Sequence, residues 1–210
     1  MRQEQAEFRK GMSCRDHIFT LRQILEQSKE WNSTVYVNFI DFEKAFDSIQ
    51  RESLWRILRH YCILSKLVNI IRLSYTDFCS QLINGNLLSD PFNINTGVKQ
   101  WCILSPFLFI IGIDWIMKNM EQSGRRGIQW TFTSMLEDLD FADDICLLSH
   151  RHIDIQAKTR DLATTAEKIG LKINIPKTKL MRMNTKSNES IILHGDKVTE
   201  IDDFTYLGLR

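Results

Sequence analysis

The chain has 210 residues, 43% hydrophobic and 25% charged, proportions that are typical of a globular protein and exclude a disordered or fibrous one. Its formal net charge of +1 gives no overall attraction to nucleic acid or to an anionic membrane, so any such affinity must come from local patches. The five cysteines are widely spaced and include no Cys-x-x-Cys pair, which excludes a disulfide framework and a zinc pattern.

The first half of the chain predicts a buried strand set among helices. Residues 34–40 are rich in β-branched and aromatic side chains and end at Asp41, which predicts a strand. The other predicted elements, in chain order, are a helix bearing Ile18, Leu21, Ile24 and Leu25, helices at 48–61 and 68–75, and a hairpin at 78–94 around Asn84-Gly85-Asn86.

The second half predicts further strands and two helices. These elements are an apolar helix at 107–120, strands at 135–141 and 145–148, a helix at 153–169, a strand at 171–175, and short strands up to residue 207. The order fits an α+β fold of split β-α-β-β-α-β type, an antiparallel sheet with helices on one face and a helix-and-hairpin insertion in its first crossover. We expect one compact unit.

Asp41, Asp143 and Asp144 form the candidate site. In the split arrangement the first strand lies beside the hairpin strands, so the three carboxylates converge at one edge and repel one another unless a divalent cation lies among them. Mg²⁺ prefers such oxygen ligands, and two ions about 4 Å apart stabilise both the attacking and the leaving oxygen of a phosphoryl displacement. The alternative is structural: Asp-Asp suits a tight turn, and Asp41 suits a helix cap.

The chain also resembles the reverse transcriptases of non-LTR (LINE-like) retrotransposons. The resemblance rests on ordered stretches that span nearly the whole chain: EQAEFRKGMSCRDHIFTLRQILEQ, VNFIDFEKAFDSIQRESLW, TGVKQWCILSPFLF, LDFADDICLLS, GLKINIPKTK and FTYLG. It implies a polymerase palm (35–176), preceded by a partial fingers segment (1–34) and followed by the end of the palm with a primer-grip hairpin (177–210). It also implies nucleotide addition to a DNA 3′ end, with an RNA template, a DNA primer, deoxynucleoside triphosphates and two Mg²⁺ (or Mn²⁺) ions.

Residue roles follow from this resemblance. Asp41, Asp143 and Asp144 match the metal-binding catalytic aspartates of the family. Phe46 matches the bulky residue under the incoming sugar, where a ring would clash with a 2′-hydroxyl, and Phe42 is assigned to the same nucleotide site. The alternative to the sugar-contact role is that Phe46 is an ordinary core aromatic.

Three further segments carry implied roles. Gln100 matches the motif that contacts nucleotide and template, although a solvent-exposed loop amide would look the same. Lys177 matches the lysine near the leaving pyrophosphate, where it would act as a general acid, whereas Lys179 is better explained as a solvated lysine. The primer-grip hairpin is carried by Phe204, Tyr206, Leu207 and Gly208, for which an apolar hairpin packed on the sheet is the alternative.

The chain departs from the family at several positions, most clearly at Trp101, where glycine is usual. Glu7, Met12 and Lys99 are smaller departures. With no endonuclease block, and with finger segments and thumb expected to be missing, the chain is expected to be an incomplete and inactive retrotransposon fragment. The alternatives are an inert nucleic-acid-binding remnant and a metal-dependent nuclease. The charged N-terminus and the short apolar run at 104–117 favour an intracellular protein, nuclear or cytoplasmic, without signal peptide or membrane span.

Overall fold

The computed structural model describes residues 13–76, 78–100, 102–121, 124, 126–131, 133–185 and 187–203. The helices in these ranges are α1 (Cys14–Trp31), α2 (Ala45–Ser48), α3 (Arg51–His60), α4 (Ser65–Ser74), α5 (Leu104–Glu121) and α6 (His152–Glu167). The strands are β1 (Val35–Ile40), β2 (Cys79–Ser80), β3 (Ile83–Asn84), β4 (Leu87–Leu88), β5 (Phe92–Asn93), β6 (Ile128–Gln129), β7 (Met135–Leu136), β8 (Asp138–Phe141), β9 (Asp144–Ser149), β10 (Lys179–Met183), β11 (Ile192–Leu193), β12 (Asp196–Lys197) and β13 (Thr199–Ile201).

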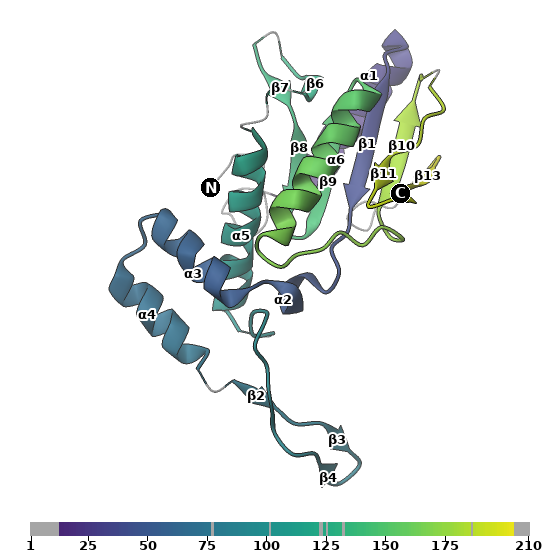
Figure 1. The fold of residues 1–210 in the computed structure, drawn as a ribbon. Coiled ribbons are helices and arrows are strands. Elements are labelled where there is room, and N and C mark those ends of the chain that lie inside the picture. Colours follow the sequence, from purple (N-terminus) through teal and green to yellow (C-terminus); the bar gives the residue numbers. More distant parts are fainter. Residues whose placement is uncertain are drawn as a thin grey trace.

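The largest sheet in the described residues has five strands in the order β13-β10-β1-β9-β8 (Figure 1). Strand β1 pairs antiparallel with β9 on one side and with β10 on the other, and all six of its residues are buried. This explains why its sequence is an almost continuous apolar run: a strand with covered faces has no solvent side to mark with polar residues. The sheet departs from the expected purely antiparallel arrangement, because β13 pairs parallel with β10.

Helices cover both faces of this sheet, so the expectation that they lie on one face is wrong. Helices α3, α5 and α6 share the larger hydrophobic core with alternate residues of β1, including Tyr36 and Ile40. Helix α1 packs on the opposite face, where Ile18, Leu21 and Ile24 of α1 meet the other alternate residues of β1. The helical periodicity of α1 predicts an apolar face but not which surface that face covers.

The strand expected at 171–175 is also misplaced, because β10 takes its position beside β1. Within 171–175 only Ile173 forms a bridge, to Phe42. The chain then turns: the backbone N–H groups of Lys177 and Thr178 donate to the carbonyl of Asn174, at 3.1 and 2.9 Å. Pro176 has no N–H to donate to a ladder, so pairing resumes only at Lys179. The alternation of apolar and polar residues favours a strand at 171–175, but the residues that pair with β1 are 179–183.

The insertion between β1 and α5 contains α3, α4 and the predicted hairpin. The hairpin is confirmed: β2 pairs with β5 and β3 with β4, and Gly85 adopts a positive φ of 61° at its tip. Figure 1 shows this arm extending away from the sheet, on the same side as the junction of α2 with β1. None of the helices in the described ranges has the length and apolarity needed to cross a membrane.

Candidate active site

The three predicted carboxylates lie at one edge of the sheet. In the β1–β9 pair Ile40 is matched with Ile145, so the next residues out, Asp41 and Asp144, face each other across the two strands. Asp143 precedes Asp144 in the turn that joins β8 to β9. Strand register alone therefore brings together residues about a hundred positions apart in the chain.

The turn that carries the acidic pair is tight. Phe141 at the end of β8 is matched with Asp144 at the start of β9, so only Ala142 and Asp143 connect the strands. Ala142 is buried and has a φ of 54°, in the left-handed region. A residue with a β-carbon is held there at a cost of about 1 kcal/mol, which the surrounding sheet must offset.

Asp41 lies in an environment that disfavours its charge. Partial burial raises the pKa of the Asp41 carboxyl group; the nearby Lys177 lowers it, the negative charge of Asp143 raises it further, and a hydrogen bond from the Asn174 side chain lowers it. The Oδ1 atom of Asp41 is buried without a hydrogen-bond partner, although the side chain as a whole is 39% exposed. Lys177 Nζ lies 4.0 Å from that atom.

The backbone of Asp41 is held by the segment that follows α6. Its carbonyl accepts a hydrogen bond of 2.8 Å from the N–H of Asn174, and its own N–H donates to Thr178 Oγ1 at 3.3 Å. Asn174 and Thr178 were not predicted from the sequence. Their types are common in loops, and only the turn at 174–178 places them beside β1.

Asp144 has a similar electrostatic environment. Although the residue is exposed, the protein around its carboxyl group removes hydration and raises its pKa, and the charges of Asp143 and Asp41 raise it further. The charges of the three carboxylates therefore interact, as expected of acids gathered at one edge.

These features fit a divalent cation that is bound partly by the protein carboxylates and partly by oxygen atoms of a substrate. A carboxylate oxygen without a hydrogen-bond partner and two carboxyl groups with raised pKa are arrangements that a hard cation would relieve. Across the described ranges, however, no three His, Cys, Asp or Glu side chains are close enough together to hold an ion by themselves. Mg²⁺ commonly binds through one or two carboxylates, with waters and phosphates completing its shell. Asp41, Asp143 and Asp144 are the residues that would hold it.

The two phenylalanines of the predicted nucleotide site differ in exposure. Phe42 is 5% exposed and its side chain belongs to the hydrophobic core. Phe46 is partly buried and stacks on Phe109 of α5, with ring centroids 4.4 Å apart. The stacking fixes the orientation of the Phe46 ring and is compatible with both the core role and the sugar-contact role.

Gln100 lies on a loop that docks against α2. Its Nε2 donates to the Asp47 carboxylate, 3.0 Å from Oδ1 and 3.3 Å from Oδ2. Asp47 was not singled out from the sequence, because nothing local distinguishes it from a solvated acid next to Phe46. The partner that reveals it is 53 residues away.

Of the two candidate lysines, Lys177 is near the acidic edge and Lys179 is not. Lys177 is 68% exposed and faces Asp41 Oδ1, whereas Lys179 Nζ donates to the carbonyl of Pro176 at 2.8 Å. Trp101 and the predicted primer-grip residues lie outside the described residues; the latter are Phe204, Tyr206, Leu207 and Gly208.

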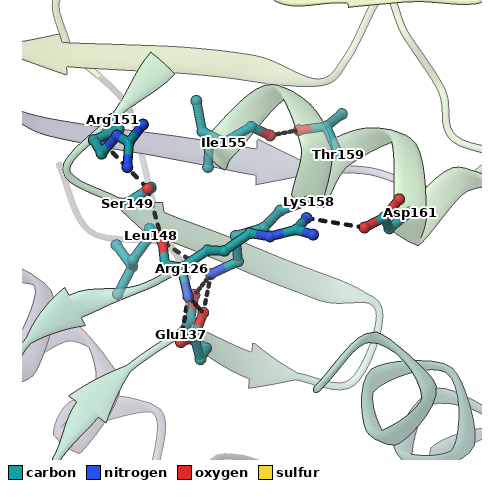
Figure 2. A network of polar contacts seen from close by, with 9 residues as sticks. All are labelled: Arg126, Glu137, Leu148, Ser149, Arg151, Ile155, Lys158, Thr159 and Asp161. Carbon is teal, nitrogen blue, oxygen red and sulfur yellow. Dashed lines mark hydrogen bonds and ion pairs between the residues drawn. The ribbon is translucent and has the colours of Figure 1, made fainter. Parts of the chain in front are cut away.

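A buried polar network, which the sequence analysis missed, holds the far end of the β8–β9 hairpin (Figure 2). Lys158 of α6 has a side chain 6% exposed, and its Nζ donates to the carbonyls of Glu137 (2.6 Å) and Leu148 (2.9 Å) and to Glu137 Oε2 (2.8 Å). Arg126 adds backbone N–H donation to the Glu137 carboxylate and an ion pair of 3.0 Å with Asp161. The network ties α6 to the hairpin whose other end carries Asp143.

Comparisons with known proteins match the chain to one family and to several relatives. The family described as "Reverse transcriptase (RNA-dependent DNA polymerase)" matches residues 1–210. The chain is 28% identical over 207 residues to a "Retrovirus-related Pol polyprotein from type-1 retrotransposable element R2" of Popillia japonica, covering 92% of this chain and 32% of the relative. It is 27% identical over 167 residues to the corresponding type-2 element R2DM protein of Drosophila melanogaster, covering 78% of this chain and 15% of the relative.

The fold is similar to that of solved telomerases. The structure of apo telomerase from Candida tropicalis, truncated from its C-terminal domain, superposes with a TM-score of 0.64 at 17% sequence identity. The match covers 99% of this chain and 40% of that one. The chain thus spans about a third of the length of the first relative and well under half of the solved structure.

Proposed function

Because the chain belongs to the reverse transcriptase (RNA-dependent DNA polymerase) family, we propose that it is the palm region of an RNA-directed DNA polymerase of a retrotransposon. In the proposed reaction the 3′-hydroxyl of a DNA primer attacks the α-phosphorus of a deoxynucleoside triphosphate, and pyrophosphate leaves. RNA is the proposed template. The observation that carries the proposal is the acidic edge, where Asp41 faces Asp144 and has a buried carboxylate oxygen without a hydrogen-bond partner.

The fold supports a palm of the split β-α-β-β-α-β type. Strands β10, β1, β9 and β8 lie side by side in the order that this arrangement requires, with α6 leading from β9 toward β10. We assign residues 35–176 to the palm with its insertion, 1–34 to part of the fingers, and 177–210 to the end of the palm and the primer-grip hairpin.

Each site residue then has one proposed task. Asp41, Asp143 and Asp144 hold two divalent ions, which would stabilise negative charge on the attacking and leaving oxygens. Lys177, exposed and close to Asp41, would give a proton to the departing pyrophosphate. Phe42 and Phe46 form the base of the nucleotide site, and Gln100 contacts the nucleotide.

The test is primer extension on an RNA template with Mg²⁺ or Mn²⁺. Asp143→Asn should abolish extension, whereas Asp196→Asn, a change to an exposed acid on β12, should leave it unchanged. Extension that survives Asp143→Asn would contradict the catalytic assignment.

Metal binding has a readout that does not depend on turnover. At Mg²⁺ about tenfold above its dissociation constant, binding to the folded state alone stabilises by about 1.4 kcal/mol, which shifts the melting temperature by several degrees. Asp41→Asn should remove most of this shift. NaCl at equal ionic strength controls for screening, and an equal shift with NaCl would argue against a specific site.

A second candidate function is binding of primer and template without turnover. It is favoured by Trp101, which stands where the family usually has glycine next to Gln100. In this case the chain would bind RNA and DNA in a filter assay, but it would not extend the primer even with Asp41, Asp143 and Asp144 unchanged.

A further inference from the structure

Arg51, the first residue of α3, binds three backbone carbonyls of the loop that leads to Gln100. Its Nη1 donates to the carbonyl of Ile94 at 2.7 Å, its Nη2 to Thr96 at 2.9 Å, and its Nε to Gly97 at 2.8 Å. A guanidinium group has five N–H donors in a planar fork, so one side chain fixes three acceptors in relation to one another. An ammonium group of the same charge has no such plane and could not reproduce this arrangement.

The loop is pressed against α2 at the position where Arg51 holds it. Gly97 has a φ of 74°, and a β-carbon there would lie 2.6 Å from the Asp47 Cα, closer than non-bonded atoms allow. The Gly97 N–H donates to the carbonyl of Ile49 and the Val98 N–H to that of Phe46, both at 2.8 Å. The backbone that precedes Gln100 is thus in direct contact with the segment that carries Phe46.

Two aromatic rings make cation–π contacts with Arg51 and also with Lys99, which lies in the loop. The Arg51 guanidinium lies 5.0 Å from the centroid of the Tyr75 ring and 5.5 Å from that of Phe78. Lys99 Nζ lies 5.4 and 4.7 Å from the same two centroids and donates to the carbonyl of Ser74 at 2.7 Å. The loop is therefore held on both sides of Gly97 just before it reaches Gln100.

We propose that Arg51 is a positioning residue for Gln100: by holding the carbonyls of residues 94, 96 and 97 it fixes the loop so that the Gln100 amide reaches Asp47 beside Phe46. Asp47 completes the arrangement by accepting from Gln100 Nε2. The proposal rests on the proposed function, in which Gln100 contacts the incoming nucleotide. It assigns Arg51 to nucleotide affinity, although Arg51 itself need not touch the nucleotide.

The test compares Arg51→Lys with Arg56→Lys in the 210-residue chain. Arg56 is exposed on the same helix and serves as the matched control. Hydrogen–deuterium exchange is measured on peptides covering 94–100, with a β1 peptide as internal reference. Loss of charge-assisted hydrogen bonds should speed exchange of the Gly97 and Val98 amides by about tenfold or more in Arg51→Lys only.

The second measurement is KM for deoxynucleoside triphosphate in primer extension, made in the chain and in its Trp101→Gly variant. Arg51→Lys should raise KM by about tenfold with kcat changed much less, because a misplaced Gln100 weakens nucleotide binding. A merely structural role would lower the amount of active protein and leave KM unchanged.

The outcomes separate this proposal from the proposed function. Unchanged amide exchange in Arg51→Lys overturns the positioning role, whatever the polymerase activity. Faster exchange with unchanged KM also overturns it, because the loop position would then not matter to the nucleotide. If neither chain extends a primer, the proposed function fails, and amide exchange alone decides whether Arg51 holds the loop.

Discussion

Asp41 and Asp144 face each other across β1 and β9, one residue beyond the matched pair of Ile40 and Ile145. Each has a carboxyl group whose pKa is raised, mainly by burial, and each interacts with the charge of Asp143. At this edge of the sheet, burial and the neighbouring negative charges therefore disfavour the ionised forms of Asp41 and Asp144.

We predict that the acidic edge lowers stability at neutral pH. A carboxyl group whose folded pKa exceeds its unfolded value binds more protons in the folded state, so stability falls as pH rises from the unfolded value of 3.8 through the raised folded pKa. Asp144→Asn should remove this cost and raise the melting temperature at pH 7, on the order of 1 °C because solvent screens an exposed site. Thermal melts at pH 4 and pH 7 measure the effect.

The gain should be smaller at pH 4 than at pH 7, because the raised pKa of the Asp144 carboxyl group favours its neutral form as the pH falls. Asp196→Asn is the control, since Asp196 is exposed on β12 and is not among the charges that shift the pKa of Asp41 or Asp144. A stabilisation by Asp144→Asn that is equal at both pH values would assign the effect to something other than charge repulsion.

Phe46→Val should admit ribonucleotides in any form of the chain that polymerises, without loss of metal binding. Removing the ring removes the proposed clash with a 2′-hydroxyl, and it also removes the stacking on Phe109, so we expect a loss of about 1–2 kcal/mol in stability. Competition between deoxy- and ribonucleotides in primer extension measures the selectivity.

Phe109→Leu separates the two roles of the ring. It removes the same stacking from the α5 side and leaves Phe46 in place, so it should destabilise the chain without changing sugar selectivity. If Phe46→Val keeps its deoxy-over-ribo selectivity, Phe46 is a core aromatic only.

Lys158→Met should cost about 3–5 kcal/mol in stability, since it leaves the Glu137 carboxylate and two carbonyls without their buried partner. Urea denaturation measures the loss. Lys168→Met, at the exposed end of the same helix, should change stability by less than about 0.5 kcal/mol. Similar midpoints for the two variants would mean that the network in Figure 2 contributes little.

In a chain extended with complete fingers and thumb, Trp101→Gly should raise primer extension well above that of its Trp101 parent. Glycine permits a close approach of backbone to ligand and a positive φ, whereas tryptophan has a β-carbon, which disfavours a positive φ, and a large ring. Single-nucleotide extension on an RNA template is the measurement. Equal activity of the two chains would show that the loop tolerates the indole and would remove the main support for the inactive-fragment hypothesis.

The sequence by itself determined the local elements and the residue types that lie at the acidic edge. The apolar run at 34–40, the turn at Ala142-Asp143-Asp144 and the hairpin around Gly85 each carry their signal within a few residues, and the structure places elements there. The convergence of the three aspartates also followed, because it requires only that the first strand lie beside the acidic hairpin.

Only the tertiary structure decided which surfaces meet. Periodicity predicts the apolar face of α1 but not which side of the sheet that face covers. Residues 171–175 alternate strictly between apolar and polar and residues 179–183 do not, although it is 179–183 that pairs with β1. Arg51 with its three carbonyls, Asp47 with Gln100, and Lys158 with Glu137 depend on contacts between residues 21 to 53 positions apart. Polar side chains of this kind have no periodic signal, because their partners are set by how the packed elements bring distant backbone together.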